Sequence, residues 1–322
     1  MAGVAAARPV KSSRETVWSQ AVAAAIMVAV LIGAPFVLYP VFLMKALCFA
    51  LFACAFNLLI GYVGLVSFGH ALYFGWASYL SAYAAKSWGL PPEISILIGT
   101  ATAAVLGLIA GSLAIRRQGI YFAMITLALA QMMYLVALRV KLTGGEDGIQ
   151  AVPRGRLFGV FDLSHEMTMY VFVLVVVLAG FFLIYRIINS PFGEVLRAIR
   201  ENEQRAISLG YKTDRYKLIA FVLSATLAGL AGSVKAFVFQ LASLTDVHWT
   251  MSGEVVLMTL VGGLGTIFGP FVGAFVVIAL ENYLAPFGQW VLVIQGAIFV
   301  VCVLVFRRGI IGELADVLHV KL

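Results

Sequence analysis

The stretch VFLMKALCFALFACAFNLLIGYV, residues 41–63, carries a single charged residue, Lys45. About 20 consecutive apolar residues are the length that crosses the hydrocarbon core of a membrane as an α-helix. Lipid offers no hydrogen-bond partner to a polypeptide backbone, so only helices and closed barrels span a bilayer. The apolar residues here follow one another without polar alternation. The stretch therefore predicts a membrane-spanning helix and argues against a barrel.

The composition extends this prediction to the whole chain. Hydrophobic residues make up 62% of the 322 residues, charged residues only 11%, and the mean hydropathy is +1.02. Soluble domains carry about 25% charged residues, so this chain could not cover a water-facing surface. The net charge of +7 lies mostly in short loops, as membrane orientation requires, and we expect no nucleic acid partner. Cys48, Cys54 and Cys302 fall inside apolar runs and are expected to be buried thiols.

We therefore expect an all-α, polytopic membrane protein with about eight transmembrane helices. A cytoplasmic tail (1–20), a single transmembrane domain (21–306) and a second cytoplasmic tail (307–322) would follow one another along the chain. The apolar runs predict nine candidate segments: 21–38, 41–63, 65–85, 94–115, 120–138, 169–185, 218–241, 255–280 and 290–306.

The segment 251–280 is the exception among these runs. It contains Gly262-Gly263-Leu264-Gly265 and then Gly269-Pro270, which interrupt a helix. If the segment spans the membrane, Arg307 and Arg308 lie outside, against the preference of basic residues for the cytoplasm. If it re-enters and turns back, eight spans remain and both termini are cytoplasmic. We favour the second interpretation.

The sequence SPFGEVLRAIRENEQRAISLGYKTDRYK, residues 190–217, is the longest cytoplasmic loop in this topology. Ser190-Pro191 favours a helix start and Gly210 a helix end. One amphipathic helix or two short helices meeting near Glu201 fit the pattern equally well. The apolar side would hold Val195, Leu196, Ala198, Ile199, Ala206, Ile207 and Leu209. Because six basic and four acidic residues are mixed here, we expect contact with a protein rather than with a lipid surface.

Two glycine-interrupted stretches in different halves of the chain indicate a translocation pathway. Residues 64–69 (GLVSFG) and 263–269 (GLGTIFG) are similar when a one-residue gap is allowed, and such pairs mark substrate sites in transporters. Close packing of helices on glycine is the alternative. His70 either lines this pathway or satisfies an interrupted backbone. The candidate pathway residues are Phe68, Gly69, His70, Tyr73, Gly262, Gly263 and Gly265.

Three lysines within or near the apolar runs need a separate explanation. Lys45, Lys86 and Lys235 lie toward the outer ends of their segments, so we expect their ammonium groups to reach the membrane surface. No carboxylate pair, catalytic triad or metal-ligand spacing is visible, and we expect no enzymatic activity.

The stretch RAIRENEQRAISLGYKTDRYKLIAF (197–221), continuing into SATLAGLAG (224–232), closely resembles the permease subunits of branched-chain amino acid ABC importers of the LivM type. Further similar stretches follow in the expected order from Leu58 to Gly312: GLVSFGHALYFGWASYL (64–80), RQGIYFAMITLALAQ (117–131), TGGEDGI (143–149), VGGLGTIFGPFVGA (261–274) and FRRGIIG (306–312).

The resemblance implies one half of an ATP-driven import pathway in a bacterial inner (plasma) membrane. The implied partners are a second, LivH-type permease, two ABC ATPase subunits and a periplasmic substrate-binding protein. No G-x-x-x-x-G-K-[ST] motif occurs, so ATP would be bound by the partners and the chain itself would need no cofactor. By analogy, the ATPase-coupling residues would be Glu194, Arg197, Ala198, Arg200, Glu201, Asn202, Glu203, Arg205, Ala206, Leu209 and Gly210.

Two alternatives remain open. The same type of permease also serves urea, short amides and aromatic acids, so these substrates stay open beside the branched-chain amino acids. A stand-alone secondary transporter or channel would use carboxylates inside its spans. The carboxylates of this chain avoid mid-span positions, apart from Glu254 and Glu281 near segment ends, which argues against proton coupling.

Overall fold

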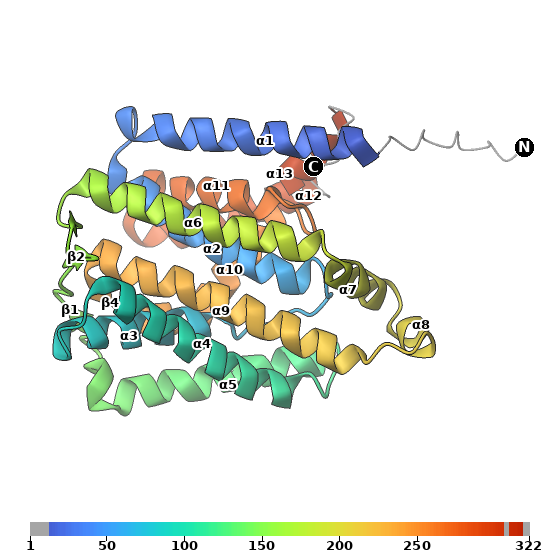
Figure 1. Ribbon diagram of the computed structural model, residues 1–322, viewed down its shortest axis with the longest axis horizontal. Helices are drawn as coiled ribbons and strands as arrows, with labels where there is room; N and C mark the ends of the chain where they lie inside the picture. Colours follow the sequence, from blue (N-terminus) through green and yellow to red (C-terminus); the bar gives the residue numbers. More distant parts are fainter. Residues whose placement is uncertain (1–12, 306–308, 318–322) are drawn as a thin grey trace, which may run out of the picture.

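The computed structural model describes residues 13–305 and 309–317 and is helical almost throughout. Its long helices lie side by side along one axis (Figure 1). In chain order they are α1 (Ser13–Gly33), α2 (Pro40–Ile60), α3 (His70–Ser87), α4 (Pro92–Ala114), α5 (Ile120–Arg139), α6 (Glu166–Ile188), α9 (Thr213–Phe239), α10 (Trp249–Gly262), α11 (Gly269–Leu284) and α12 (Val291–Val305). The expected tails extend into residues 1–12, 306–308 and 318–322, which lie outside the described residues.

The shorter elements gather at the two ends of these helices. At one end lie α7 (Pro191–Glu201), α8 (Glu203–Ser208) and α13 (Gly309–Val317), together with the start of α1 (Figure 1). At the other end β1 (Ile149–Gln150) pairs antiparallel with β4 (Leu241–Ala242), and β2 (Arg156–Leu157) with β3 (Phe161–Asp162). Short 3-10 turns complete the chain: η1 (Ala34–Phe36), η2 (Lys141–Thr143), η3 (Leu244–Asp246) and η4 (Ala285–Trp290).

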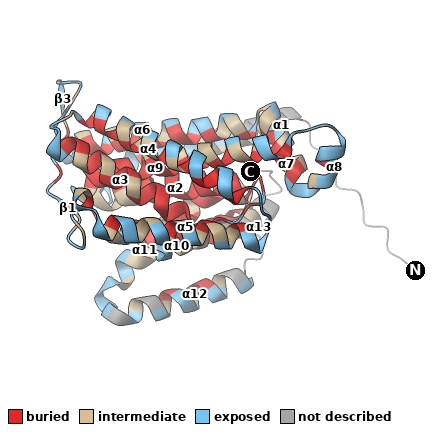
Figure 2. Cartoon of the chain, turned by 90° about the horizontal axis from the view of Figure 1, so that it is seen from below, coloured by how far each residue is buried: buried red, intermediate tan, exposed pale blue. Residues whose placement is uncertain are grey.

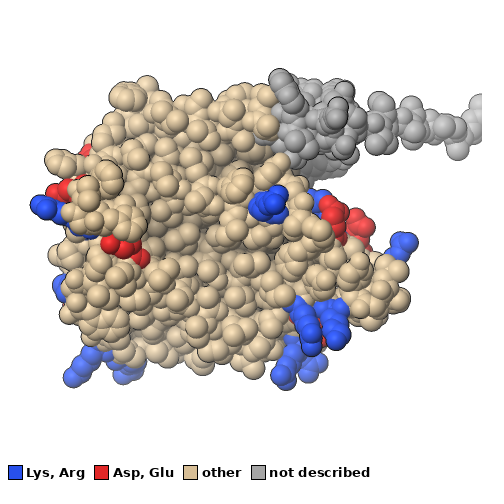
Figure 3. Space-filling model, viewed as in Figure 1, with Lys and Arg blue, Asp and Glu red and all other residues tan. Residues whose placement is uncertain are grey.

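The fold class expected from the sequence is confirmed. Six helices in the described part are long and apolar enough to cross a membrane: α2, α4, α5, α6, α9 and the stretch Gly269–Gly288 that contains α11. Two shorter apolar stretches, Ala21–Phe36 and Val293–Cys302, belong to α1 and α12. On the face seen in Figure 3, most charged side chains lie toward the two ends, with a wide uncharged belt between them. A band of this kind is what a bilayer requires.

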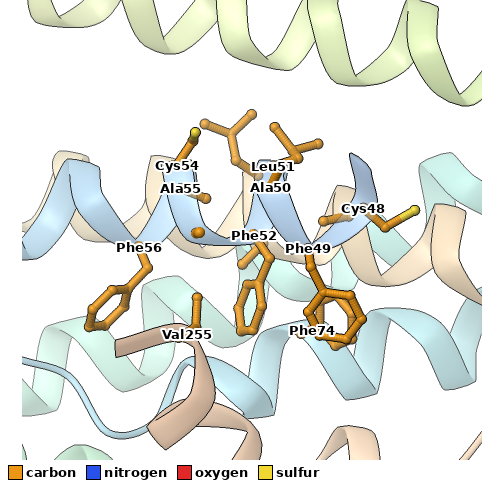
Figure 4. Packing of buried hydrophobic residues seen from close by; sticks show 14 of the residues in the cluster. Cys48, Phe49, Ala50, Leu51, Phe52, Cys54, Ala55, Phe56, Phe74 and Val255 are labelled. Carbon is orange, nitrogen blue, oxygen red and sulfur yellow. The ribbon is translucent and has the colours of Figure 1, made fainter. Parts of the chain in front are cut away.

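Helix α2 forms the centre of the molecule, since 89% of its apolar window is buried, against 22% for α5 at the periphery. A helix that is apolar all round belongs inside a protein. Phe52 stacks on Phe74 of α3 with ring centroids 4.6 Å apart, and Figure 4 shows Phe49, Phe52 and Phe56 pointing to the same side of α2. Buried residues are concentrated in α2, α3 and α9 (Figure 2).

One expected span, 65–85, is wrong at its beginning. Residues 61–69 form an irregular turn, and α3 begins only at His70. Gly64 in this turn adopts φ +82°, a left-handed conformation that favours glycine. Helix α3 is nevertheless buried over most of its length, so it packs against protein rather than lipid.

The segment 251–280 is broken, as expected. Helix α10 ends at Gly262, residues 263–268 form a turn, and α11 begins at Gly269. A Cβ at Gly262 would meet the backbone of Gly269, and one at Gly273 would meet Met258, so the two helices run antiparallel against each other. At 14 residues, α10 is about 21 Å long, shorter than a full crossing of about 30 Å.

Candidate functional site

The loop 190–217 folds as two helices, which decides between the two alternatives expected from the sequence. Helix α7 ends at Glu201 because Asn202 adopts an extended backbone (φ −158°, ψ 100°). The Asn202 side chain then accepts a hydrogen bond from the Arg205 backbone N–H (3.0 Å) and caps α8. Asparagine at this position satisfies a backbone donor that has no partner within the helix.

Glu203 attaches α8 to the body of the protein. Its carboxylate receives Lys217 Nζ of α9 at 2.5 Å and Gln118 Nε2, from the turn between α4 and α5, at 2.8 Å. The Lys217 side chain is only 3% exposed. The structure explains the position of Glu203 by this ion pair. The signal that sequence reasoning missed was Lys217, which lies fourteen residues away.

Arg200 connects α7 to the two glycine-interrupted stretches. Its guanidinium donates to the Gly61 carbonyl oxygen at the end of α2 and lies beside Gly265. Asn57 of α2 completes the contact, because it accepts from Gly265 N–H (3.0 Å) and donates to the Thr266 carbonyl oxygen (2.9 Å). We call Asn57, Gly61, Arg200, Gly265 and Thr266 the Asn57 junction.

Arg197 makes a second contact between α7 and the core. Its guanidinium lies 5.5 Å from the centre of the Tyr62 ring, just beyond the end of α2, and its Nη1 pairs with Glu194 at 2.8 Å. Burial raises the pKa of Tyr62 to about 12, so this ring stays neutral at physiological pH. A cation facing a neutral aromatic ring is a favourable contact.

Other side chains of this region point outward. Among the coupling residues expected from the sequence, Ala206 is buried and Ala198 half-buried, whereas Glu201, Asn202, Arg205, Leu209 and Gly210 are exposed. Leu209 is 70% exposed, Ile207 48% and Tyr211 41%. The residues expected on one apolar side thus separate: Leu196, Ile199 and Ala206 are buried, whereas Ile207 and Leu209 are exposed, since the break at Asn202 prevents one helical periodicity from continuing. We call Glu201, Arg205, Ile207, Leu209 and Tyr211 the α8 surface.

The histidine assigned to the candidate pathway lies inside the chain. His70 has no exposed surface, and its Nε2 bonds Ser224 Oγ of α9 at 2.9 Å. Ser224 donates to the Ala55 carbonyl oxygen (2.6 Å), which leaves Nε2 as the donor to Ser224. The rings of Phe56 and Tyr73 enclose the imidazole edge-on. In this structure His70 joins α3 to α9 and α2, and a role in the pathway stays a prediction.

The glycines of the candidate pathway mostly allow close packing. Gly69 lies against the Thr126 carbonyl of α5, and the neighbouring Phe68 N–H donates to Thr126 Oγ1 (3.2 Å). Gly262 lies against Gly269, and Gly263 adopts φ +126° next to Gly309. Gly265 is the member of this set that contacts the expected coupling segment, through Arg200.

One of the three lysines does not behave as expected. Lys235 is 8% exposed and bonds both carboxylate oxygens of Asp246, at 2.7 and 2.6 Å, so its ammonium group ends on a buried carboxylate of the same chain. Lys45 pairs with Glu281 of α11 at 2.7 Å, and its side chain is partly exposed. Lys86 donates to the Gln150 carbonyl oxygen (2.7 Å) at the exposed end of α3.

Within the described residues, no group of three or more His, Cys, Asp or Glu side chains is arranged to hold a metal ion. The fold and the contacts define a multi-pass helical membrane protein in which one end presents two short helices tied to the interior. The sequence model of the family "Branched-chain amino acid transport system / permease component" matches residues 38–303. The chain belongs to this family of ABC transporter permeases.

Individual relatives agree with this assignment. The LivM permease of the high-affinity branched-chain amino acid transport system of Escherichia coli (strain K12) is 25% identical over 288 residues, or 82% of this chain and 68% of the relative. A probable LivH permease of Methanocaldococcus jannaschii is 28% identical over 169 residues (48% and 51%). The ribose import permease RbsC of Bacillus subtilis (strain 168) is 28% identical over 173 residues (51% and 51%). No solved structure matches the chain.

Proposed function

We propose that this chain forms half of the translocation pathway of an ATP-driven importer for branched-chain or related small zwitterionic amino acids. Its partners would be a LivH-type permease, two ABC ATPase subunits and a periplasmic substrate-binding protein, assembled in the inner (plasma) membrane of a bacterium. The ATPase subunits would bind ATP, and this chain would bind no cofactor and catalyse no reaction.

The observation that carries this proposal is the α8 surface. Ile207, Leu209 and Tyr211 expose apolar side chains at one end of the molecule, and the charged residues Glu201 and Arg205 of the same segment are exposed as well. Apolar anchors surrounded by charges are typical of protein interfaces. Because α7 and α8 are held by Lys217 and the Asn57 junction, a force applied to this surface would reach α2, α9 and the α10–α11 turn.

The substrate class rests on the family and on the relatives named above. The E. coli relative belongs to a branched-chain amino acid system, whereas the B. subtilis relative imports ribose. A competition experiment must therefore include a sugar beside the amino acids.

The test is reconstitution of the chain with its co-encoded LivH-type permease, two ATPase subunits and binding protein in proteoliposomes. We expect accumulation of labelled leucine that requires ATP and is reduced by excess isoleucine or valine, but not by ribose. Uptake without the ATPase subunits, driven by a proton gradient, would contradict the proposal. Competition by ribose alone would reassign the substrate while leaving the ATP-driven mechanism intact.

A further inference from the structure

A second set of charged side chains lies in the half of the helices opposite α7 and α8. Lys45, near the start of α2, pairs with Glu281, near the end of α11. Helix α10 packs against both α2 and α11, and its Glu254 lies within electrostatic range of both residues of this pair and of Asp246. Three helices thus bring one cation and two carboxylates together, with Asp246 nearby.

These side chains are inside the helices rather than at their tips. Lys45 is the sixth residue of α2, about 8 Å along the axis from its first residue. The side chains of Lys45 and Glu281 are nevertheless 31% and 32% exposed. A charged group in contact with hydrocarbon is energetically unfavourable. The surface that these residues share is therefore better suited to water or to a polar ligand than to lipid.

Glu254 is the carboxylate of this group that lacks a cation of its own. Within the described part of the chain, Lys45 pairs with Glu281 and Lys235 with Asp246, whereas no hydrogen bond or ion pair holds Glu254. The neighbouring Gly253 faces open space, since a Cβ there would meet no atom within 4 Å. Thr250, one turn earlier in α10, is exposed.

A buried hydroxyl extends this polar group toward the interior. Tyr79 of α3 has no exposed surface, and its hydroxyl has no hydrogen-bond partner among the described residues. It lies on α3, which packs against η3, the turn that carries Asp246. A buried polar atom without a partner is destabilising, and a polar ligand would supply the missing hydrogen bond.

We propose that Glu254, with Lys45 and Glu281, forms the site at which the chain receives the charged ends of a zwitterionic amino acid. The Glu254 carboxylate binds the substrate ammonium group. The Lys45 ammonium has three donors, so it binds the substrate carboxylate while it keeps Glu281. This assignment rests on the proposed function, because it presumes that amino acids pass through the chain.

The first experiment measures whether water reaches this surface. Gly253→Cys is combined with Cys302→Ser in the complete transporter. Cys48 and Cys54 are left in place because both are buried. We expect rapid modification by a cationic, membrane-impermeant methanethiosulfonate added from outside, and slower modification when the binding protein and leucine are present. The matched control is Val175→Cys on the exposed apolar side of α6, which we expect to face lipid. Equal, slow modification at both positions would overturn the proposal.

The second experiment separates binding from structure. We expect Glu254→Gln to reduce leucine uptake per ATP hydrolysed at least tenfold, with normal assembly of the complex, and Glu254→Asp to restore part of it. In the double variant Gly253→Cys/Glu254→Gln, modification of the introduced thiol by the methanethiosulfonate should stay fast, but leucine should no longer slow it. The control Glu166→Gln removes an exposed carboxylate in the first turn of α6 and should change nothing.

The two proposals can fail separately. If the wild-type complex takes up leucine with ATP and Glu254→Gln is indistinguishable from it, the assignment of Glu254 is wrong and the proposed function stands. If the wild-type complex takes up no amino acid at all, both are wrong.

Discussion

Asp246 neutralises a lysine that is buried between α9 and the turn that follows it. Its carboxylate holds Lys235 Nζ through both oxygens and also accepts from the Ser243 N–H (3.2 Å). We expect Asp246→Asn to lower the free energy of unfolding by roughly 3–5 kcal/mol, because removing one partner leaves a buried charge uncompensated. Thermal unfolding of the purified protein in detergent measures this loss.

The double variant Lys235→Met/Asp246→Asn is the control for that prediction. It removes both charges and should recover a large part of the lost stability, since a neutral apolar side chain replaces the unpaired cation. A double variant less stable than Asp246→Asn alone would contradict the explanation by charge.

Gly232 permits the close approach of α9 to α3. A Cβ at this position would collide with the carbonyl oxygen of Phe74, a backbone atom that cannot rotate away. We expect Gly232→Ala to destabilise the protein by about 1–3 kcal/mol through overpacking, measured as a lower unfolding temperature. Gly296→Ala in α12 meets no atom within 4 Å and should be neutral or slightly stabilising. Equal effects of the two substitutions would rule out the steric explanation.

At the scale of the element, α8 combines a buried attachment with an exposed surface. We expect Leu209→Asp to leave the unfolding temperature of the chain unchanged, because Leu209 is 70% exposed. Association with the ATPase subunits should weaken at least tenfold, since an apolar anchor at an interface contributes about 2 kcal/mol or more. Co-purification and titration with the ATPase subunits measure both quantities.

Val160→Asp is the matched control for α8. Val160 is 75% exposed but lies in the turn between β2 and β3, at the opposite end of the molecule. The Val160→Asp variant should retain full association with the ATPase subunits. If both substitutions weakened association equally, the α8 surface would not be the binding site.

The residues of α7 and α8 have different roles, although the sequence suggested a single set of coupling residues. Arg200 and Glu203 form hydrogen bonds within the chain, although Arg200 is also exposed, and Glu201 and Arg205 are exposed members of the α8 surface. Local sequence predicted the helix start at Ser190-Pro191 and allowed the break near Glu201. It could not assign the inward and outward positions after Asn202, because the extended backbone there resets the direction of α8.

At the scale of the whole molecule, the Asn57 junction connects the α7–α8 end to the central helix and to the α10–α11 turn. We expect Asn57→Leu to preserve assembly and ATP hydrolysis while reducing the leucine transported per ATP several-fold. The reason is that the bonds to Gly265 and Thr266 would be lost and α11 would no longer follow α2. Parallel measurement of ATP hydrolysis and uptake in proteoliposomes tests this.

Arg116→Ala is the control for the Asn57 junction. Arg116 is exposed at the same end of the molecule, and its removal should leave the ratio of transport to hydrolysis unchanged. A normal ratio in Asn57→Leu would show that the junction is structural only.

The sequence by itself determined the class of protein, the break between Gly262 and Gly269 and the membership of the family, because apolar run length, glycine and proline act locally. Only the tertiary structure decided which distant groups meet: Lys45 with Glu281, Arg200 with Gly61, and His70 with Ser224. These pairs are 236, 139 and 154 residues apart in sequence. No helical periodicity relates such residues, and their contact follows from how α2, α3, α7, α9 and α11 pack together.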